Sequence, residues 1–173
     1  MAVKPIATVP NKVLTTKTEK IKSIDADAKA LAKDLLDTIK LTKKPEGAGL
    51  AANQIGVAKR MCVVRNFVED PVNFEGAIAE EYVLINPRIT SASKETELDW
   101  EGCLSVPNSY GRVERFKKIK VTALDLSGQE IKIKANGYFA RTIQHEINHL
   151  DGILFTQKVV GPLITEEELG KQP

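Results

Sequence analysis

The chain has 173 residues, of which 42% are hydrophobic and 28% are charged, so its composition is that of a folded globular protein and excludes a disordered one. Its 25 basic and 23 acidic residues leave a net charge of only +2, which gives no reason to expect nucleic-acid recognition. No apolar run approaches the roughly 18 residues of a membrane span, and residues 1–22 have no signal-peptide pattern. We therefore expect one domain over residues 1–173, located in the cytoplasm and without a membrane partner.

The first periodic pattern in the chain covers residues 24–41. Acidic residues lie near its start and lysines near its end, as the helix dipole favours. Its apolar residues recur at near-helical spacing: Ile24, Ala28, Leu31, Leu35 and Ile39. The pattern predicts an amphipathic α-helix that ends before Pro45 and has a structural role. We expect the basic cluster of Lys40, Lys43 and Lys44 to solvate the end of this helix.

The middle of the chain has the composition of β-structure. Strands are predicted at residues 61–65, 82–89 and 118–124, and a further one at 129–134 forms a hairpin across Ser127-Gly128.

A second helix is predicted at residues 137–150, with Asn136 as a candidate N-cap and Gly152 just past its end. One face carries Phe139, Ile143, Ile147 and Leu150, and we expect it to rest on the sheet. The predicted fold class is α+β: mainly antiparallel β-sheets around this central helix, with another α-helix near the N-terminus.

The strongest local motif is His145-Glu146-Ile147-Asn148-His149. Residues i and i+4 of a helix lie on one face, so both imidazoles can bind one metal ion, while Glu146 can accept a proton from water. A lone histidine on a helix is more often an ordinary packed or exposed residue. These two are the only histidines in the chain, however, and their spacing around a glutamate predicts a metal site.

A catalytic metal site of this kind needs a third protein ligand. One candidate lies among Glu166–Glu168, at a spacing comparable to that of thermolysin-like proteases, but Thr165 begins a helix-capping pattern there, and we favour capping. The other candidate is Cys103 within Glu101–Pro107, where a flanking glycine and a following proline indicate a tightly defined backbone. A cysteine is more often a small buried side chain, and we adopt that interpretation for Cys62.

Three segments in fixed order resemble the motifs that define the peptide deformylase family. They are a glycine-rich segment ending in glutamine (Gly47–Gln54), an EGCLS segment (Glu101–Ser105) and a QHExxH segment (Gln144–His149). The resemblance extends over residues 5–160, nearly the whole chain. It implies a metal-dependent hydrolase that removes the formyl group from the N-terminal N-formylmethionine of nascent polypeptides and releases formate.

The resemblance implies a role for each matching residue. It makes the metal ligands Cys103, His145 and His149. Glu146 would be the general base and later the proton donor to the leaving amine. Gln54 and the backbone N–H of Leu104 would stabilise the oxyanion.

Further residues resemble family positions around these groups. Glu101 resembles a residue that contacts the metal ligands without binding the metal, and Arg115 is its expected partner. The alternative is that Glu101 and Arg115 form an ordinary surface ion pair. The backbone of Gly47, Ala48 and Gly49 would form an edge to which the peptide adds as a β-strand, although a simple turn explains two glycines equally well.

Tyr138 and Thr142 share the helix face of the metal ligands and would line the pocket for the methionine side chain of an N-formylmethionyl nascent peptide. The alternative is that Tyr138 only packs against the sheet.

One divalent metal ion per chain is implied. A thiolate ligand suits soft or borderline metals, so Zn²⁺ would bind well. The resemblance implies Fe²⁺ as the native metal, which Zn²⁺, Ni²⁺ or Co²⁺ can replace.

The chain departs from the family pattern at three places. Asn53 stands where many members have proline, and Tyr110 lies near a position where some members use arginine to hold the substrate backbone, so we assign Tyr110 no role. The tail after Pro162 is short and acidic, whereas some bacterial members end in a long basic helix implicated in transient ribosome contact. We do not expect ribosome docking by that route.

Two other functions compete with this interpretation. A zinc peptidase would share the HExxH chemistry but would leave Cys103 and Gln54 without roles. A structural metal site usually has four protein ligands, whereas only three convincing ones are visible here, and it would need neither Glu146 nor Gln54.

Overall fold

The computed structural model of the chain describes residues 3–42, 47–69 and 77–172. Its strands are β1 (Gly49–Ala51), β2 (Met61–Glu69), β3 (Ala77–Ala92), β4 (Thr96–Cys103), β5 (Val106–Phe116), β6 (Lys118–Leu124) and β7 (Glu130–Asn136). Its α-helices are α1 (Ala26–Ile39), α2 (Gly137–Leu150) and α3 (Glu166–Leu169), and short 3-10 helices cover Lys12–Thr15, Ala52–Ile55 and Phe155–Gln157. None of the helices in these ranges is long and apolar enough to cross a membrane.

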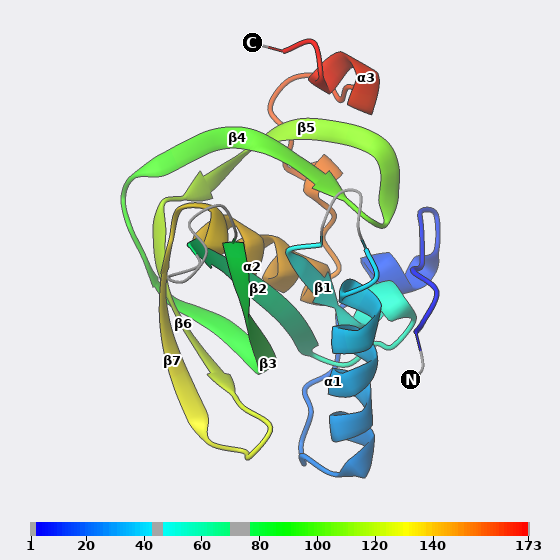
Figure 1. The fold of residues 1–173 in the computed structure, drawn as a ribbon, viewed down its shortest axis with the longest axis vertical. Helices are drawn as coiled ribbons and strands as arrows, with labels where there is room; N and C mark the ends of the chain where they lie inside the picture. The colour runs from blue at the N-terminus through cyan, green and yellow to red at the C-terminus, as the bar shows by residue number, and fades with distance from the viewer. Residues whose placement is uncertain (1–2, 43–46, 70–76, 173) are drawn as a thin grey trace.

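The strands form two antiparallel sheets. The larger sheet has the order β1-β2-β3-β6-β7, and β4 pairs with β5 in a separate hairpin that arches over α2 (Figure 1). The predicted class, α+β with mainly antiparallel sheets, is confirmed.

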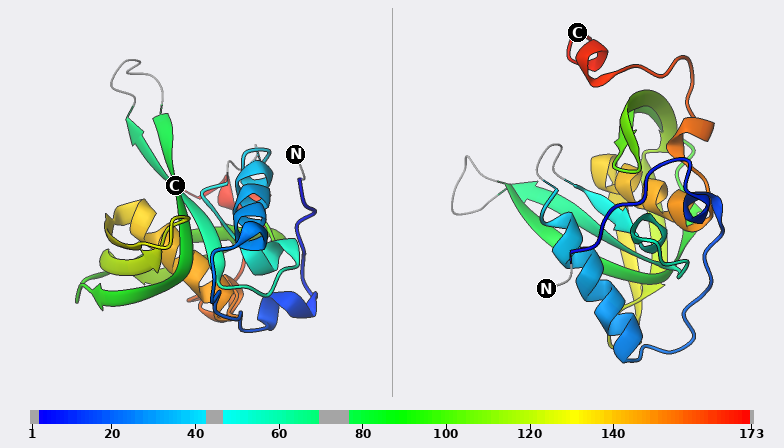
Figure 2. Two further views of the ribbon diagram at one scale, coloured as in Figure 1. Left: turned by 90° about the horizontal axis from the view of Figure 1, so that it is seen from below. Right: turned by 90° about the vertical axis from the view of Figure 1, so that its right-hand side faces the viewer.

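The helices α1 and α2 pack on opposite faces of the larger sheet (Figure 2). Successive side chains of a strand point to opposite faces, and β2 uses both. Met61 and Val63 pack with α1, whereas Cys62 and Val64 pack with α2. All four are fully buried, which explains why β2 begins with an uninterrupted apolar run.

The helix α2 lies between the larger sheet and the β4–β5 hairpin. Its residues Ala140, Ile143, Ile147 and Leu150 belong to the core cluster on that face of the sheet, with Phe139 packed at its edge. Asn136 occupies the N-cap position, but its side chain makes no capping hydrogen bond. The opposite side of α2 faces the hairpin and carries the two histidines.

The helix α1 begins after Asp25, whose side chain accepts a hydrogen bond from the backbone N–H of Ala28 at 3.0 Å. It ends at Ile39, with Lys40 as its C-cap residue, while Lys43, Lys44 and Pro45 lie outside the described residues.

The sequence analysis missed the hairpin of β4 and β5. Charged residues and a half-buried tryptophan alternate along β4, so its apolar content is too low to indicate a strand. Cys103 is the last residue of β4, and its register with Val106 shifts relative to the preceding pair, Gly102 and Tyr110. The tight backbone expected around Cys103 is therefore the end of a hairpin.

We expect Leu35→Ala to lower the free energy of unfolding by about 2–5 kcal/mol, because the Leu35 side chain is fully buried between α1 and the sheet. Lys29→Ala, at an exposed position of the same helix, should change it by less than about 0.5 kcal/mol. Urea titration of the two variants measures the difference. Equal stabilities would contradict the packing of α1 described above.

Candidate functional site

Three side chains from two elements meet above α2. Cys103 comes from the end of β4, and His145 and His149 come from successive turns of α2. The Nε2 atom of His149 lies 3.2 Å from the Sγ of Cys103 and 3.2 Å from the Nε2 of His145. In the described part of the chain these three form the group of potential metal-binding donors, all within 4.8 Å of one another.

The spacing of these donors fits a single metal ion. Bonds of 2.0–2.3 Å to a tetrahedral metal place neighbouring ligand atoms roughly 3.3–3.6 Å apart, close to the two separations found here. Burial and the positive charge of His145 hold the pKa of His149 well below its usual range, so its imidazole is neutral and has a lone pair to donate.

The surroundings of His145 favour a cation. Burial alone would lower its pKa, but hydrogen bonds with Cys103 and Glu101 outweigh that effect and raise the pKa to about 10. A place that holds a proton this firmly between a thiol and a carboxylate also stabilises a metal cation there. The donor set therefore fits the metal that the sequence predicted.

The sulfur of Cys103 has further donors around it. The backbone N–H of Ser105 lies 3.4 Å from it and the Nε2 of Gln54 lies 3.6 Å from it. Two N–H donors therefore point at the sulfur that would bind the metal. Cys62, by contrast, is fully buried in the core, where burial raises the pKa of its thiol, in agreement with the packing role expected for it.

Glu146, the residue after His145 on α2, is buried, and burial raises its pKa to about 7. Its Oε2 atom has no hydrogen-bond partner among the described residues. A Cβ atom added to Gly49 would lie 2.4 Å from the Oε1 of Glu146, so only glycine lets β1 approach this carboxylate. One carboxylate oxygen of Glu146 can therefore accept a proton from a molecule bound in the cleft.

Gln54 is held with its amide donor towards the metal-binding group. Its Oε1 accepts from the backbone N–H of Ala51 at 2.8 Å, which leaves Nε2 to contact the hydroxyl of Ser105 at 3.2 Å. Asn53, the departure from proline, donates from its side chain to the backbone carbonyl of His149 at 2.6 Å. This asparagine therefore ties the 3-10 helix Ala52–Ile55 to the end of α2.

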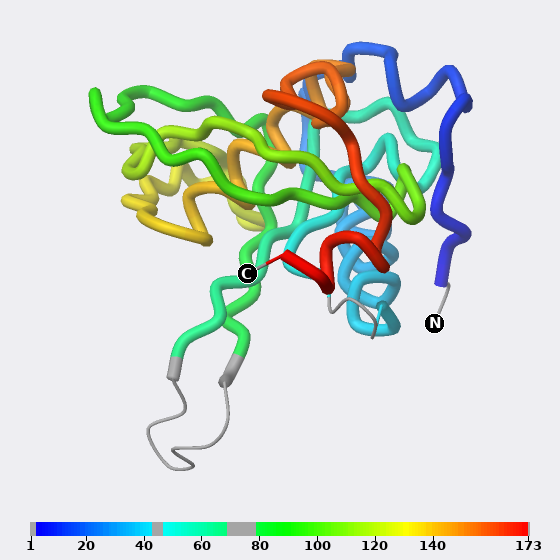
Figure 3. The backbone as a smooth tube through the Cα atoms, turned by 90° about the horizontal axis from the view of Figure 1, so that it is seen from above, coloured from blue at the N-terminus to red at the C-terminus, as the bar shows by residue number. Residues whose placement is uncertain are grey.

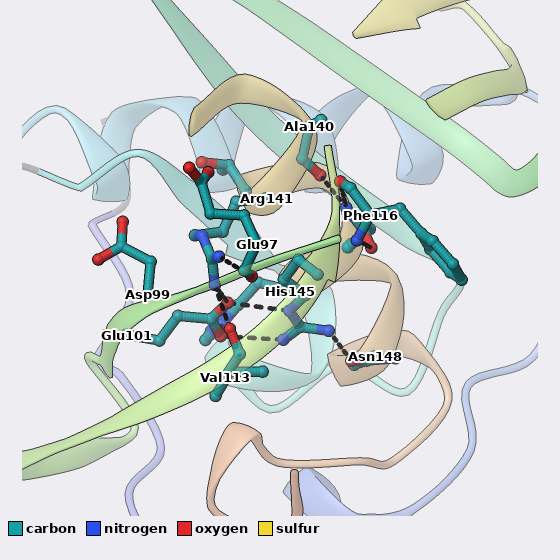
Figure 4. Close-up of polar contacts among 12 residues, drawn as sticks. Glu97, Asp99, Glu101, Val113, Phe116, Ala140, Arg141, His145 and Asn148 are labelled. Carbon is teal, nitrogen blue, oxygen red and sulfur yellow. Dashed lines mark hydrogen bonds and ion pairs between the residues drawn. The ribbon is translucent and has the colours of Figure 1, made fainter. Parts of the chain in front are cut away.

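Behind His145 lies a buried carboxylate, Glu101, which accepts from three partners (Figure 4). Its Oε2 accepts from His145 Nδ1 at 3.0 Å and from Arg115 at 2.9 Å, while its Oε1 accepts from Arg115 at 2.9 Å and from Arg141 at 2.8 Å. Burial alone would raise the pKa of Glu101, but the hydrogen bonds from Arg115 and His145 hold it well below its usual range. The predicted pair of Glu101 and Arg115 is thus a buried contact and not an ordinary surface ion pair.

A cleft of about 450 Å³ opens over these groups. The residues that the sequence analysis singled out and that line it are Gly47, Ala48, Gly49, Gln54, Glu101, Cys103, Leu104, Tyr138, Thr142, His145 and Glu146. Tyr138 is largely exposed at the edge of the cleft, so it does not simply pack against the sheet.

The acidic segment near the C-terminus has the capping role that we favoured. Thr165 Oγ1 accepts from the backbone N–H of Glu168 at 3.3 Å, and Glu168 Oε2 accepts from the backbone N–H of Thr165 at 2.7 Å. No glutamate of this segment belongs to the donor group formed by the described residues.

One residue of the site, Arg141, had no predicted role. Arg141 donates to Glu101 and to the backbone carbonyls of Val113 and Glu97, both at 2.8 Å. Its position four residues before His145 places it on the same helix face, a signal that was available in the sequence. No sequence pattern indicated the contact of Gly49 with Glu146.

Comparison with known proteins agrees with this geometry. The profile of the family described as "Polypeptide deformylase" matches residues 3–162. A peptide deformylase of Thermomicrobium roseum is 43% identical over 162 residues, which cover 92% of this chain and 87% of that protein.

Solved structures show the same likeness. A peptide deformylase of Ehrlichia chaffeensis in complex with actinonin has a TM-score of 0.81 and 39% identity, covering 92% of this chain and 90% of that one. A class I type b peptide deformylase of Acinetobacter baumannii bound to Met-Ala-Ser has a TM-score of 0.79 and 32% identity, covering 91% of this chain and 99% of that one.

We expect Cys103→Ser to lose bound metal, because a neutral hydroxyl replaces the thiolate of a three-residue donor group. Cys62→Ser is the matched control, since that sulfur is buried in the core away from the donors. Metal content after gel filtration under anaerobic conditions measures the effect. Retention of one ion per chain by Cys103→Ser would show that the sulfur is not a ligand.

Proposed function

Because the chain belongs to the polypeptide deformylase family and is a hydrolase of N-formylmethionyl peptides, we propose that it releases formate from nascent polypeptides in a metal-dependent reaction. The observation that carries the proposal is the convergence of Cys103, His145 and His149 with Glu146 in one cleft. The catalytic unit is the single domain of residues 1–173, with α2 as its central helix and α1 as its N-terminal one, and it works in the cytoplasm.

The proposed ligands of one divalent ion are Cys103, His145 and His149. When bound, such an ion lowers the pKa of water from ~15.7 towards ~7 and thereby supplies hydroxide at neutral pH. We propose Fe²⁺ as the native ion, replaceable by Zn²⁺, Ni²⁺ or Co²⁺, because a mixed sulfur and nitrogen donor set suits borderline metals.

Glu146 moves the protons. Its buried carboxylate accepts a proton from the attacking water and later gives it to the amine of the departing methionine. A pKa of about 7 suits both transfers, and the unpartnered Oε2 is free to make them.

The negative charge that develops on the formyl oxygen needs hydrogen-bond donors that are already in place. Gln54 offers its Nε2, whose direction is fixed by the bond from Ala51 to its other amide atom. The backbone N–H of Leu104, next to Cys103 in the hairpin turn, is the second proposed donor.

The peptide itself adds to the free edge of β1. This strand is the last in the larger sheet, with β2 on one side, and we place the extended peptide along its other edge, beside Gly47, Ala48 and Gly49. The segment before the strand is held in place, because the N–H of Gly47 donates to Thr42 Oγ1 at 3.1 Å and the carbonyls of Gly47 and Ala48 accept from Arg65 at 3.3 and 2.8 Å. The methionine side chain then enters the part of the cleft lined by Tyr138 and Thr142. Met-Ala-Ser, bound to the relative from A. baumannii, has the composition of a product that such a cleft would release.

The proposed partners are N-formylmethionyl nascent peptides, without recognition of nucleic acid or of membranes by the chain itself.

We expect Glu146→Gln to keep its metal but to lose at least about 10²–10⁴-fold in turnover of formyl-Met-Ala-Ser, since the amide is isosteric and cannot take the proton. Formate release by the metal-loaded protein, with metal content determined on the same sample, measures both quantities. Undiminished turnover would remove Glu146 from the mechanism. Failure of the unmodified, metal-loaded chain to release formate would overturn the proposed function.

A further inference from the structure

The segment after α2 returns to the active-site cleft along β5. Val160 donates its backbone N–H to the carbonyl of Arg112 at 2.8 Å, and Tyr110 and Ile164 exchange backbone hydrogen bonds of 2.9 and 2.8 Å. Figure 3 shows this orange and red segment crossing over the β4–β5 hairpin. The chain end described here is therefore attached to the hairpin that carries Cys103.

The helix α3 is fixed at the mouth of the cleft. The backbone N–H of Glu166 donates to the Oδ1 of Asn108 on β5 at 3.0 Å, and the capping box formed by Thr165 and Glu168 sets the first turn. Glu166 and Leu169, three residues apart on one face, both line the cleft. Glu167 points elsewhere, because its side chain is 81% exposed and pairs with Lys171 at 2.7 Å.

The other charged side chains that line the cleft either pair with one another or belong to the proposed reaction centre. Glu101 is paired with Arg115 and Arg141, and the guanidinium of Arg141 is further occupied by two backbone carbonyls. His145 and Glu146 belong to the reaction centre. Over the described ranges, no lysine or arginine lies within ion-pair distance of Glu166, so its carboxylate is the free ionic group on the cleft wall.

The charge of Glu166 affects a neighbouring residue of the cleft wall. Burial and the nearby Glu166 raise the pKa of Tyr110, which also lines the cleft. Tyr110 stands near the position at which the sequence analysis noted an arginine in some family members. Among the described residues, this part of the wall carries the phenol of Tyr110 and the carboxylate of Glu166, while Arg141, which also lines the cleft, is paired with Glu101.

We propose that Glu166 is a specificity-determining residue, which favours formylated peptides that carry lysine or arginine directly after the methionine. This inference rests on the proposed function. The formyl group lies at the donor group, and the peptide adds to the β1 edge at Gly47–Gly49. Asn108–Tyr110 and α3 line the same cleft, so the residues after methionine leave it past Glu166. Cationic side chains are attracted there and anionic ones repelled.

The test compares three substrates on the metal-loaded, full-length protein at low ionic strength: formyl-Met-Lys-Lys, formyl-Met-Glu-Glu and the neutral formyl-Met-Ala-Ser. We expect kcat/KM for the lysine peptide to exceed that for the glutamate peptide by about two- to fivefold, within the range for exposed charge pairs. The ratio should fall towards one in about 0.5 M NaCl, where exposed charges are screened.

Two variants locate the effect. Glu166→Gln should reduce the ratio to near one while leaving the neutral peptide unaffected. Glu167→Gln removes the same charge from the same helical turn but faces away from the cleft, so it should keep the ratio of the unmodified protein.

The outcomes separate this inference from the proposed function. A ratio near one in the unmodified protein, an undiminished ratio in Glu166→Gln, or an equal loss in Glu167→Gln would overturn the role of Glu166 while deformylation of the neutral peptide stands. Absence of formate release from all three peptides would overturn the proposed function and this inference with it.

Discussion

The site depends on one buried carboxylate. Glu101 lies on β4, yet it accepts hydrogen bonds from Arg115 on β5 and from Arg141 and His145 on α2. A buried charge is costly unless it is fully paired, and here two guanidinium groups and an imidazole provide that pairing. Arg115 also donates to Asn148, one residue before His149. The β4–β5 hairpin is thereby held on α2, with Cys103 facing the histidines.

A second constraint reaches the site through the larger sheet. Because β2 is buried between α1 and α2, its position is fixed on both faces, and β1 is hydrogen-bonded along it. Gly49 on β1 then approaches Glu146 so closely that no side chain fits between them. The same strand thus limits the space around the proposed base, and its other edge is where we propose that the peptide adds. Packing of residues far in sequence from the proposed metal ligands therefore sets the position of Glu146, the proposed proton-transferring group.

The elements that could be predicted from the sequence are those whose apolar or functional residues recur every few positions along the chain. Helical spacing indicated the segments that form α1 and α2, and the i, i+4 histidines placed two donors on one face. The hairpin of β4 and β5 was missed because few of its residues are apolar: Leu98 and Trp100 alternate with acidic residues along β4, and charged residues occupy much of β5. The choice of Cys103 over the C-terminal glutamates came from the family resemblance, since ligand spacing alone left both open. Contacts across the chain, such as Asn53 with the carbonyl of His149, have no sequence period and required the structure.

The central claim is that Glu101 assembles the metal centre by joining the hairpin to α2. Competition with a chelator of known affinity, on samples whose folded state is verified by circular dichroism, measures Zn²⁺ binding by Glu101→Gln. The control is Glu97→Gln, an exposed side chain on the same strand. We predict that Glu101→Gln weakens Zn²⁺ binding by about 10–100-fold, as expected for loss of a carboxylate that orients a ligating histidine, while Glu97→Gln binds normally. Unchanged affinity in folded Glu101→Gln would contradict the account.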